Sequence, residues 1–244
     1  MRRISAGAVA VLLLVASPGA TAQRSASDET IGRLVTQQLM DEDITTVGVS
    51  VASGIVTLRG TVRTLWIKQR ALEEAAKVDD VISVYSELTV PRGESDERIA
   101  AQVAQRLQRY VFFTIFDDAD VEAHDGVITL TGRVTMAYKA EAFADLAAHA
   151  PGVQEVRNEV RTLPVSLFDD QLRYAVARQI YGDSLFSRYA TQVNPPVHII
   201  VEHGKVTLTG VVFSEVERRK AEAIARGTFS VMGVTNKLRI ERED

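Results

Sequence analysis

The chain has 244 residues, with 28 basic and 32 acidic side chains and a formal net charge of −4 at pH 7. This weakly acidic balance argues against a nucleic-acid role for the whole surface, because contact with phosphates needs a basic stripe. The chain contains no cysteine, which excludes disulfides, cysteine-based zinc sites and thiol catalysis.

The first 22 residues predict a secretory signal peptide. Two arginines near the start precede an uncharged, largely apolar run over residues 6–15, and the small residues 20–22 offer a cleavage site. The apolar run is too short to span about 30 Å of hydrocarbon. We expect cleavage before Gln23, a linker over residues 23–27, and a soluble protein in a bacterial periplasm. Loss of the two arginines changes the net charge to −6 (26 − 32).

A helix, a β-hairpin, a second helix and a third strand are predicted in residues 28–90, which we interpret as the first domain. Apolar residues at i, i+3, i+4 and i+8 predict the buried face of its first helix: Ile31, Leu34, Val35 and Leu39. Alternation with a period of two predicts the inward side of the hairpin: Val47, Val49, Val51, Val56, Leu58, Gly60 and Val62. An alanine-rich helix is expected over residues 66–77. The third strand is expected to point inward at Val84, Ser86 and Leu88.

A nine-residue motif recurs in the three predicted hairpins. It reads G-x-[VI]-T-L-x-G-x-V, and its copies start 72 residues (126 − 54) and 78 residues (204 − 126) apart. The first glycine of each copy is expected to close a tight turn with positive φ, where a Cβ would clash: Gly54, Gly126 and Gly204. The second glycine lies on the apolar face, and its missing Cβ is expected to let a helix backbone approach closely: Gly60, Gly132 and Gly210.

The same order of elements recurs in residues 95–163 and 168–242, the second and third predicted domains. Short linkers with proline separate the domains, and Ser95 is expected to cap the first helix of the second domain. The order α-β-β-α-β predicts an α+β fold of three tandem small sandwiches. In each one, two helices cover one face of a three-stranded mixed sheet and leave the threonine-rich face in water.

The recurring motif, followed by an alanine-rich helix and then V-x-x-V-x-N, resembles the BON domain family. The last element is clearest at 152–158, close at 231–236, and departs at the asparagine in 81–86, where Ser86 stands. The resemblance implies an exported bacterial protein similar to osmotically inducible, stress-responsive periplasmic proteins and outer-membrane lipoproteins. It also implies phospholipid binding, a role in envelope integrity, or chaperone-like activity. No cysteine follows the apolar run, so the lipoprotein anchor is not expected.

The most unusual segment of the chain is aromatic and follows two arginines. Arg106 and Arg109 precede Tyr110, Phe112 and Phe113. One interpretation is contact with anionic lipid headgroups, which basic and aromatic side chains favour at a membrane surface. The other is that the rings fill the core between the first helix and the hairpin of the second domain. The two aspartates that follow would repel anionic lipid.

Two further features are candidate contact sites. Trp66 lies among three successive apolar residues, which cannot all face one core, so we interpret it as an inter-domain contact or a lipid anchor. Arg218, Arg219 and Lys220 form a basic run on a helix. Such a run is either a solvated helix face or a phosphate contact worth about 1 kcal/mol per basic residue near an anionic membrane.

The sequence gives little support for a catalytic role. The four histidines lack metal-binding spacing, and no nucleophile motif or phosphate-binding loop occurs. We therefore predict a non-enzymatic protein without metal or cofactor, whose partners are anionic phospholipid or envelope proteins and which touches membranes only peripherally. The alternative is a chaperone-like or protein-interaction module, whose clients dock on exposed apolar surface or add a strand to a sheet edge. A third possibility is an architectural adaptor in a secretion apparatus.

Overall fold

The computed structural model describes residues 18–241, and these form two compact units. One unit holds the first domain, and the other holds the second and third domains together with the segment Val62–Lys68. Most of the predicted signal peptide, residues 1–17, lies outside the described residues. Within the described part of the chain, no helix combines the length and the apolar character needed to cross a membrane.

The first domain has the predicted order of elements. Its helices are α1 (Pro18–Asp41) and α2 (Leu65–Ala76), and its strands are β1 (Val47–Ala52), β2 (Ile55–Thr61) and β3 (Ser83–Thr89). β2 is the central strand, antiparallel to β1 and parallel to β3. Ile31, Val35 and Leu39 are buried as predicted, but Leu34 is 40% exposed. At 100° per residue, Leu34 falls about 60° outside the stripe that begins at Ile31, on the margin of the packed face.

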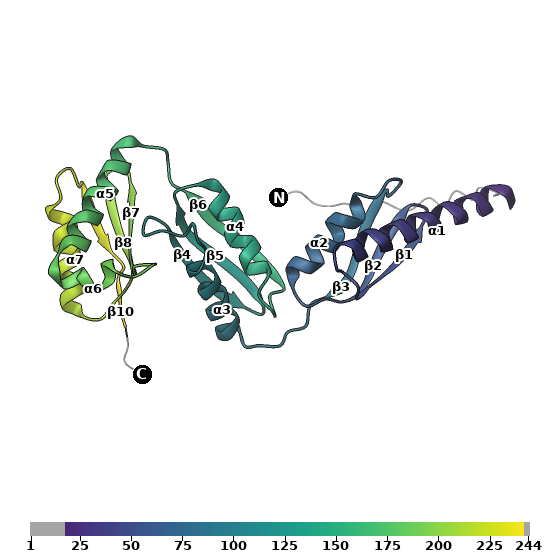
Figure 1. The fold of residues 1–244 in the computed structure, drawn as a ribbon, viewed down its shortest axis with the longest axis horizontal. Helices are drawn as coiled ribbons and strands as arrows, with labels where there is room; N and C mark the ends of the chain where they lie inside the picture. The colour runs from purple at the N-terminus through teal and green to yellow at the C-terminus, as the bar shows by residue number, and fades with distance from the viewer. Residues whose placement is uncertain (1–17, 242–244) are drawn as a thin grey trace, which may run out of the picture. The chain divides into compact units, whose positions relative to one another are not determined.

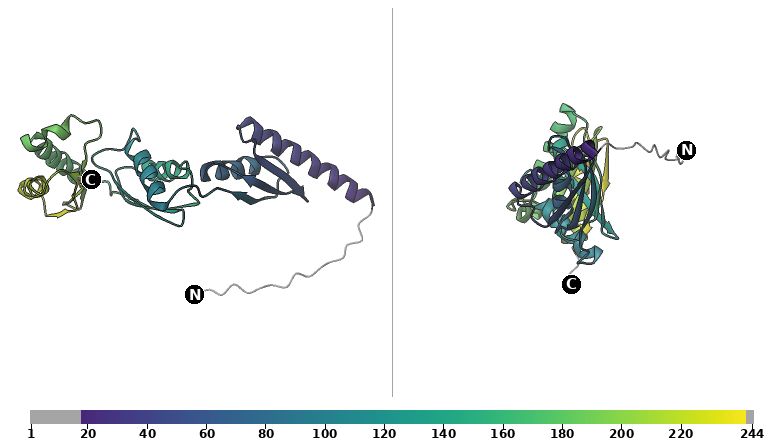
Figure 2. Two further views of the ribbon diagram at one scale, coloured as in Figure 1. Left: turned by 90° about the horizontal axis from the view of Figure 1, so that it is seen from below. Right: turned by 90° about the vertical axis from the view of Figure 1, so that its right-hand side faces the viewer.

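The second domain repeats this arrangement. Its elements are α3 (Asp96–Gln108), β4 (Asp118–His124), β5 (Val127–Val134), α4 (Ala137–Ala148) and β6 (Glu155–Thr162). The sheet order is β4-β5-β6, and both helices lie on one face of this sheet (Figures 1 and 2). Apolar side chains from α3, β5 and α4 meet in a buried core: Ile99, Val103, Leu107, Ile128, Leu130, Val134 and Phe143.

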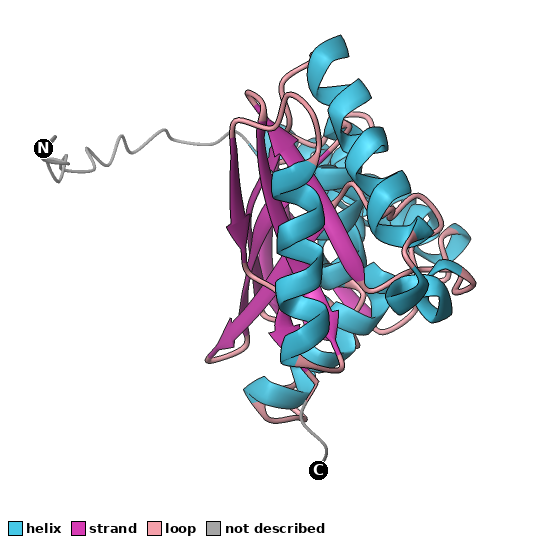
Figure 3. Ribbon diagram, turned by 90° about the vertical axis from the view of Figure 1, so that its left-hand side faces the viewer, coloured by secondary structure: helices cyan, strands magenta, loops and turns pink. Residues whose placement is uncertain are grey.

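The third domain carries two additions. Its shared elements are α5 (Leu167–Gly182), β7 (Val197–Glu202), β8 (Lys205–Val212), α7 (Glu215–Gly227) and β9 (Gly233–Asn236). A short strand, β10 (Arg239–Ile240), also pairs parallel with β8. The insertion before the hairpin forms a 3-10 turn (Ser184–Phe186) and helix α6 (Ser187–Ala190), which place Phe186 and Tyr189 in the core. Figure 3 views the molecule from this domain, with helices and strands in different colours. The helix-free face of its sheet is partly covered, because His198, Ile200 and Thr209 on that face are buried.

A carboxylate in the first helix of each domain binds the turn of the hairpin. Asp28, Asp96 and Asp169 each accept hydrogen bonds from two successive backbone amides of the turn, at 2.7 to 2.9 Å. The second of those amides belongs to the first motif glycine, whose φ is +73° to +77° in all three copies, as predicted. The carboxylate therefore ties the helix to the hairpin. Its signal in the sequence is an aspartate three residues before the first buried apolar residue of the helix.

The second motif glycine has a different role from the one predicted. No helix approaches it; the backbone carbonyl at the entry to the edge strand does. A Cβ on Gly60 would lie 2.7 Å from the carbonyl oxygen of Thr46, and one on Gly210 would lie 1.8 Å from that of Pro196. These glycines also have φ between +102° and +140°, which side chains rarely allow. The constraint thus comes from the neighbouring strand within the sheet.

The asparagine of the V-x-x-V-x-N element joins the third strand to the second helix. Asn158 donates to the carbonyl of Ala140 in α4 at 2.7 Å and accepts from the amide of Val160 at 3.2 Å. Asn236 makes the equivalent pair of bonds in the third domain. Ser86 and Asn158 are exposed, although the bond to Ala140 places the side chain of Asn158 on the helix-covered side of the sheet. The serine is too short to reach α2, and it keeps only the bond from the following amide of Leu88.

Candidate functional site

The aromatic segment after α3 faces in two directions. Tyr110 and Phe113 turn inward and make edge-to-face contacts with Phe143 in the core of the second domain, at centroid distances of 6.1 and 5.7 Å. Ile115 and Phe116 pack against the core of the third domain. The inner rings of the segment therefore fill the core of the second domain and contact the core of the third domain.

The remaining residues of the segment form an exposed apolar patch with the start of α4. Four side chains make up this patch, and they are exposed by 80%, 52%, 55% and 49% respectively: Val111, Phe112, Met136 and Tyr138. The rings of Phe112 and Tyr138 meet edge to face at 6.0 Å. Exposed apolar side chains that gather from two elements mark contact sites on proteins.

A buried ion pair holds this patch in place. The carboxylate of Asp117 is fully buried and accepts bonds from Lys139 Nζ at 2.6 Å and from the amides and hydroxyls of Thr114 and Thr135. Burial alone would raise the pKa of Asp117, but the bonds from Lys139, Thr135 and Thr114 together hold it below its ordinary value. The network fixes the segment that carries Phe112 to the first turn of α4.

The basic residues predicted as contacts differ in how free they are. Arg106 and Arg109 are exposed at the end of α3, and neither has an ion pair within the described part of the chain. On α7, Arg218 and Arg219 both bind the carboxylate of Glu215, at 2.6 and 2.8 Å, and these bonds lower the pKa of Glu215 to about 2. Lys220 pairs with Asp183 at 3.1 Å. Unpaired positive charge therefore lies beside the apolar patch of the second domain.

Trp66 is engaged within the protein. Its ring stacks on His149, which follows α4, at a centroid distance of 4.5 Å. Its neighbour Leu65 is buried in the core cluster of the second domain. The ring of Trp66 is thus covered in part by a side chain of the same compact unit.

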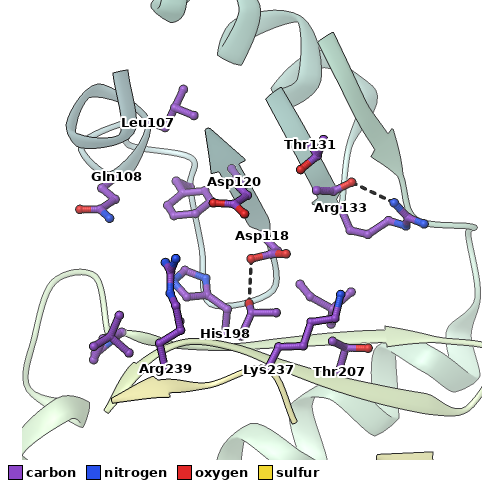
Figure 4. A pocket seen from close by; sticks show the side chains of 18 of the residues that line it. Leu107, Gln108, Asp118, Asp120, Thr131, Arg133, His198, Thr207, Lys237 and Arg239 are labelled. Carbon is purple, nitrogen blue, oxygen red and sulfur yellow. Dashed lines mark hydrogen bonds between the residues drawn. The ribbon is translucent and has the colours of Figure 1, made fainter. Parts of the chain in front are cut away.

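A polar cleft of about 1120 Å³ lies between the second and third domains. Its walls are the edge of the sheet at β4 and β5 and the open face of the third-domain sheet. In Figure 4, Lys237 and Arg239 rise from that sheet into the space below Asp118 and Asp120. Sequence reasoning missed this cleft, since many of its residues belong to a solvent-facing strand side in their own domain.

The contacts that close the cleft centre on His198. Its Nδ1 lies 2.7 Å from the carbonyl oxygen of Asp117, its ring lies 5.1 Å from Phe113, and it is 8% exposed. Burial lowers the pKa of His198, and the carbonyl of Asp117 opposes that shift in part. Beside it, the hydroxyl of Thr209 donates to Asp118 at 2.8 Å.

The chemistry of the cleft suits binding rather than reaction. His198 has one ring nitrogen committed to a carbonyl, and Glu202 pairs with Arg133 at 3.6 Å. Lys205, Lys237 and Arg239 have no ion pair within residues 27–241, so they can meet an anionic group. In the second domain, Asp96, His124 and Asp125 bring potential metal ligands within 4.8 Å of one another. Both oxygens of Asp96 already bind the hairpin turn, and this group needs no ion to explain it.

Comparison with known proteins identifies the repeated unit. A sequence model described as BON domain matches three segments: residues 27–92, 95–164 and 170–242. No curated protein matches the chain. Two solved structures that resemble it are of CdsD, a structural protein of the type III secretion system of Chlamydia trachomatis. The C-terminal domain of CdsD is 18% identical, with coverage of 86% of this chain and 96% of that chain and a TM-score of 0.25. The other is 17% identical, with coverage of 87% and 92% and a TM-score of 0.26. Scores this low carry no argument about function.

Proposed function

The chain belongs to the BON domain family, and we propose that it is a non-enzymatic periplasmic protein that binds anionic phospholipid at a membrane surface. BON domains are non-catalytic and are associated with phospholipid and with the cell envelope. The observation that carries the proposal is the apolar patch of Val111, Phe112, Met136 and Tyr138 beside the unpaired Arg106 and Arg109.

The patch has the composition that peripheral membrane contact requires. Full burial of a side chain such as Val or Phe is worth about 1.5 to 3 kcal/mol, so insertion of the half-exposed Phe112 and the more exposed Val111 supplies about 1 to 2 kcal/mol each. Arg106 and Arg109 add about 1 kcal/mol each near an anionic surface. The sum of about 4 to 6 kcal/mol supports weak, reversible and salt-sensitive association, as expected of a peripheral protein.

Vesicle co-sedimentation tests the proposal. The chain from Gln23 onward is mixed with vesicles of phosphatidylglycerol or of phosphatidylcholine, at low and high salt. We expect binding to the anionic vesicles at low salt, and a reduction of about thirtyfold or more when Val111 and Phe112 are both changed to serine. Substitution of Val193 or Phe229 by serine is the matched control, because these side chains are also fully or almost fully exposed but lie outside the patch.

The charges are tested by a second pair of variants. Arg106→Glu with Arg109→Glu should abolish binding to the anionic vesicles. Arg218→Glu with Arg219→Glu should change it much less, since those two arginines are already paired with Glu215. Absence of binding to phosphatidylglycerol at low salt would remove the proposal, and equal losses in the two charge variants would move the contact away from the patch.

A second candidate function is protein interaction, as in a chaperone-like module. The observation that favours it is the edge strand β1, which carries no charged side chain over Val47–Ala52. Suppression of the aggregation of an unfolded client, without any vesicle binding, would favour this function over the first.

A further inference from the structure

The cleft between the second and third domains has a defined shape, because polar contacts join its two walls. The side chains of Arg133 and Glu202 form an ion pair across the gap at 3.6 Å. The side chain of Asn194 donates to the carbonyl oxygen of Gln108 at 3.1 Å, and all four residues line the cleft. Its volume of about 1120 Å³ lies slightly above the range of about 300 to 1000 Å³ of small-molecule sites. The cleft therefore has room for a ligand of one or a few rings.

Three cations without ion pairs lie on the floor of the cleft. Lys205, Lys237 and Arg239 are exposed on the side of the third-domain sheet away from its core, and none has an ion pair among the described side chains. Arg239 stands opposite Val211, six residues (211 − 205) along β8 from Lys205. At about 3.3 Å per residue, the row of cations extends over about 20 Å. Ammonium and guanidinium groups only donate hydrogen bonds, so this floor lacks acceptors and favours acid groups.

The opposite wall has the reverse requirement. Asp118 and Asp120 reach from β4 toward the same space (Figure 4). Asp118 accepts a bond from the hydroxyl of Thr209 at 2.8 Å. The Oδ1 of Asp120 accepts from the amide of Val121 at 3.2 Å, and its Oδ2 has no hydrogen bond within the described part of the chain. An ionised carboxylate only accepts, so this wall needs donors from a ligand and repels its acid groups.

Threonine hydroxyls complete the lining of the cleft. Three of them have no hydrogen bond among the residues that the structure describes: Thr131, Thr207 and Thr235. A hydroxyl both donates and accepts, so these side chains complement hydroxyl groups on a ligand. A ligand that satisfies the whole cleft thus carries acid groups toward the cations and hydroxyl groups toward the carboxylates and threonines.

We propose that this cleft binds an acidic sugar, a monosaccharide or short oligosaccharide that carries carboxylate or phosphate groups. The guanidinium of Arg239 can bind either acid group with two parallel hydrogen bonds, and Lys237 adds a second charge. A sugar hydroxyl can donate to Asp120 as Thr209 donates to Asp118. An acidic peptide without hydroxyls would satisfy the floor alone. The cleft shares no residue with the apolar patch, so the proposal is independent of membrane binding.

Isothermal titration calorimetry on the chain from Gln23 onward tests this proposal. The probes are trigalacturonate, which carries carboxylates, and fructose bisphosphate, which carries phosphates. We expect saturable, salt-sensitive binding of at least one of them, and the one that binds identifies the acid group. The methyl ester of trigalacturonate, which is uncharged, and a capped triglutamate peptide, which has no hydroxyls, should each bind at least tenfold more weakly than the acidic sugar.

Paired charge variants locate the site. Lys237→Gln with Arg239→Gln should weaken binding of the acidic sugar by about tenfold or more, because each removed cation makes a charge-assisted hydrogen bond, and should leave vesicle binding unchanged. Arg106→Gln with Arg109→Gln is the matched control, since it removes two exposed cations outside the cleft and should leave sugar binding unchanged. NMR shifts at the amides of Thr207 and Thr235 during titration of the parent chain keep the proposal falsifiable should the cleft variant fail to fold.

Asp120→Asn separates a hydroxyl donor from an ammonium donor. Asparagine keeps an acceptor oxygen and removes a charge that repels acid groups, so an acidic sugar should bind at least as tightly as to the parent chain. A ligand that binds through an ammonium group would bind more weakly, and that result would overturn the assigned class. Absence of binding by both acidic sugars, equally tight binding of triglutamate, or equal losses in the two charge variants would also overturn the proposal.

Discussion

Replacement of Asp117 by asparagine should destabilise the second domain by several kcal/mol. The carboxylate is fully buried and accepts five hydrogen bonds, the shortest of them 2.6 Å from Lys139 Nζ. Asparagine keeps the shape but leaves the ammonium of Lys139 buried without a counter-charge, and its amide group meets donors where an acceptor is needed. Removal of one partner of a buried pair costs about 3 to 5 kcal/mol.

Urea unfolding, followed by hydrogen exchange at amides of β5 and α4, measures this cost separately from the other domains. Asp120→Asn is the control, since that carboxylate is exposed and should change stability by less than about 0.5 kcal/mol. The double variant Asp117→Asn with Lys139→Met removes the orphaned charge and should be more stable than Asp117→Asn alone. A loss below about 1 kcal/mol in the single variant, or no recovery in the double variant, would refute the role assigned to the pair.

The same pair predicts the response to acid. The pKa of Asp117 is lower in the folded protein than in the unfolded chain, so the unfolded chain takes up a proton first as the pH falls. The stabilisation is thus complete above the ordinary aspartate pKa of about 4 and is lost as the pH falls through the lower folded value. Asp117→Asn should flatten this part of the curve of stability against pH.

Two further predictions concern the third domain. Burial lowers the pKa of His198 below 6.5, so His198 binds a proton more readily when the second and third domains are separated than when they are docked. NMR contacts between these domains should therefore weaken as the pH falls below about 6.5. His198→Phe should remove this pH dependence, and an unchanged dependence would contradict the role assigned to His198. Gly210→Ala places a Cβ 1.8 Å from the carbonyl oxygen of Pro196 at a φ of +102° and should cost more than about 2 kcal/mol in thermal unfolding. Gly182→Ala, with nothing within 4 Å of its Cβ, should change stability by less than about 1 kcal/mol, and equal effects of the two variants would show that the crowding at Gly210 does not matter.

Local patterns in the sequence determined the architecture of each domain. Buried helix faces and hairpin strands follow from periods of 3.6 and 2, which depend only on neighbouring residues. The positive φ of the first motif glycine is likewise a property of its own turn. These patterns also contained the aspartate that binds the turn, although its role becomes visible only when the helix lies beside the hairpin.

Only the tertiary structure shows which apolar side chains and strand edges stay exposed and which are covered. The segment after α3 is apolar and aromatic throughout residues 110–116. Phe113 and Phe116 nevertheless pack against cores, whereas Val111 and Phe112 stay exposed. The three edge strands have one alternating pattern, but only the fold shows that a distant segment contacts β7 and that a carboxylate of β4 accepts a bond from its own strand. Such differences depend on partners far away along the chain, and a periodicity of neighbouring residues holds no information about them.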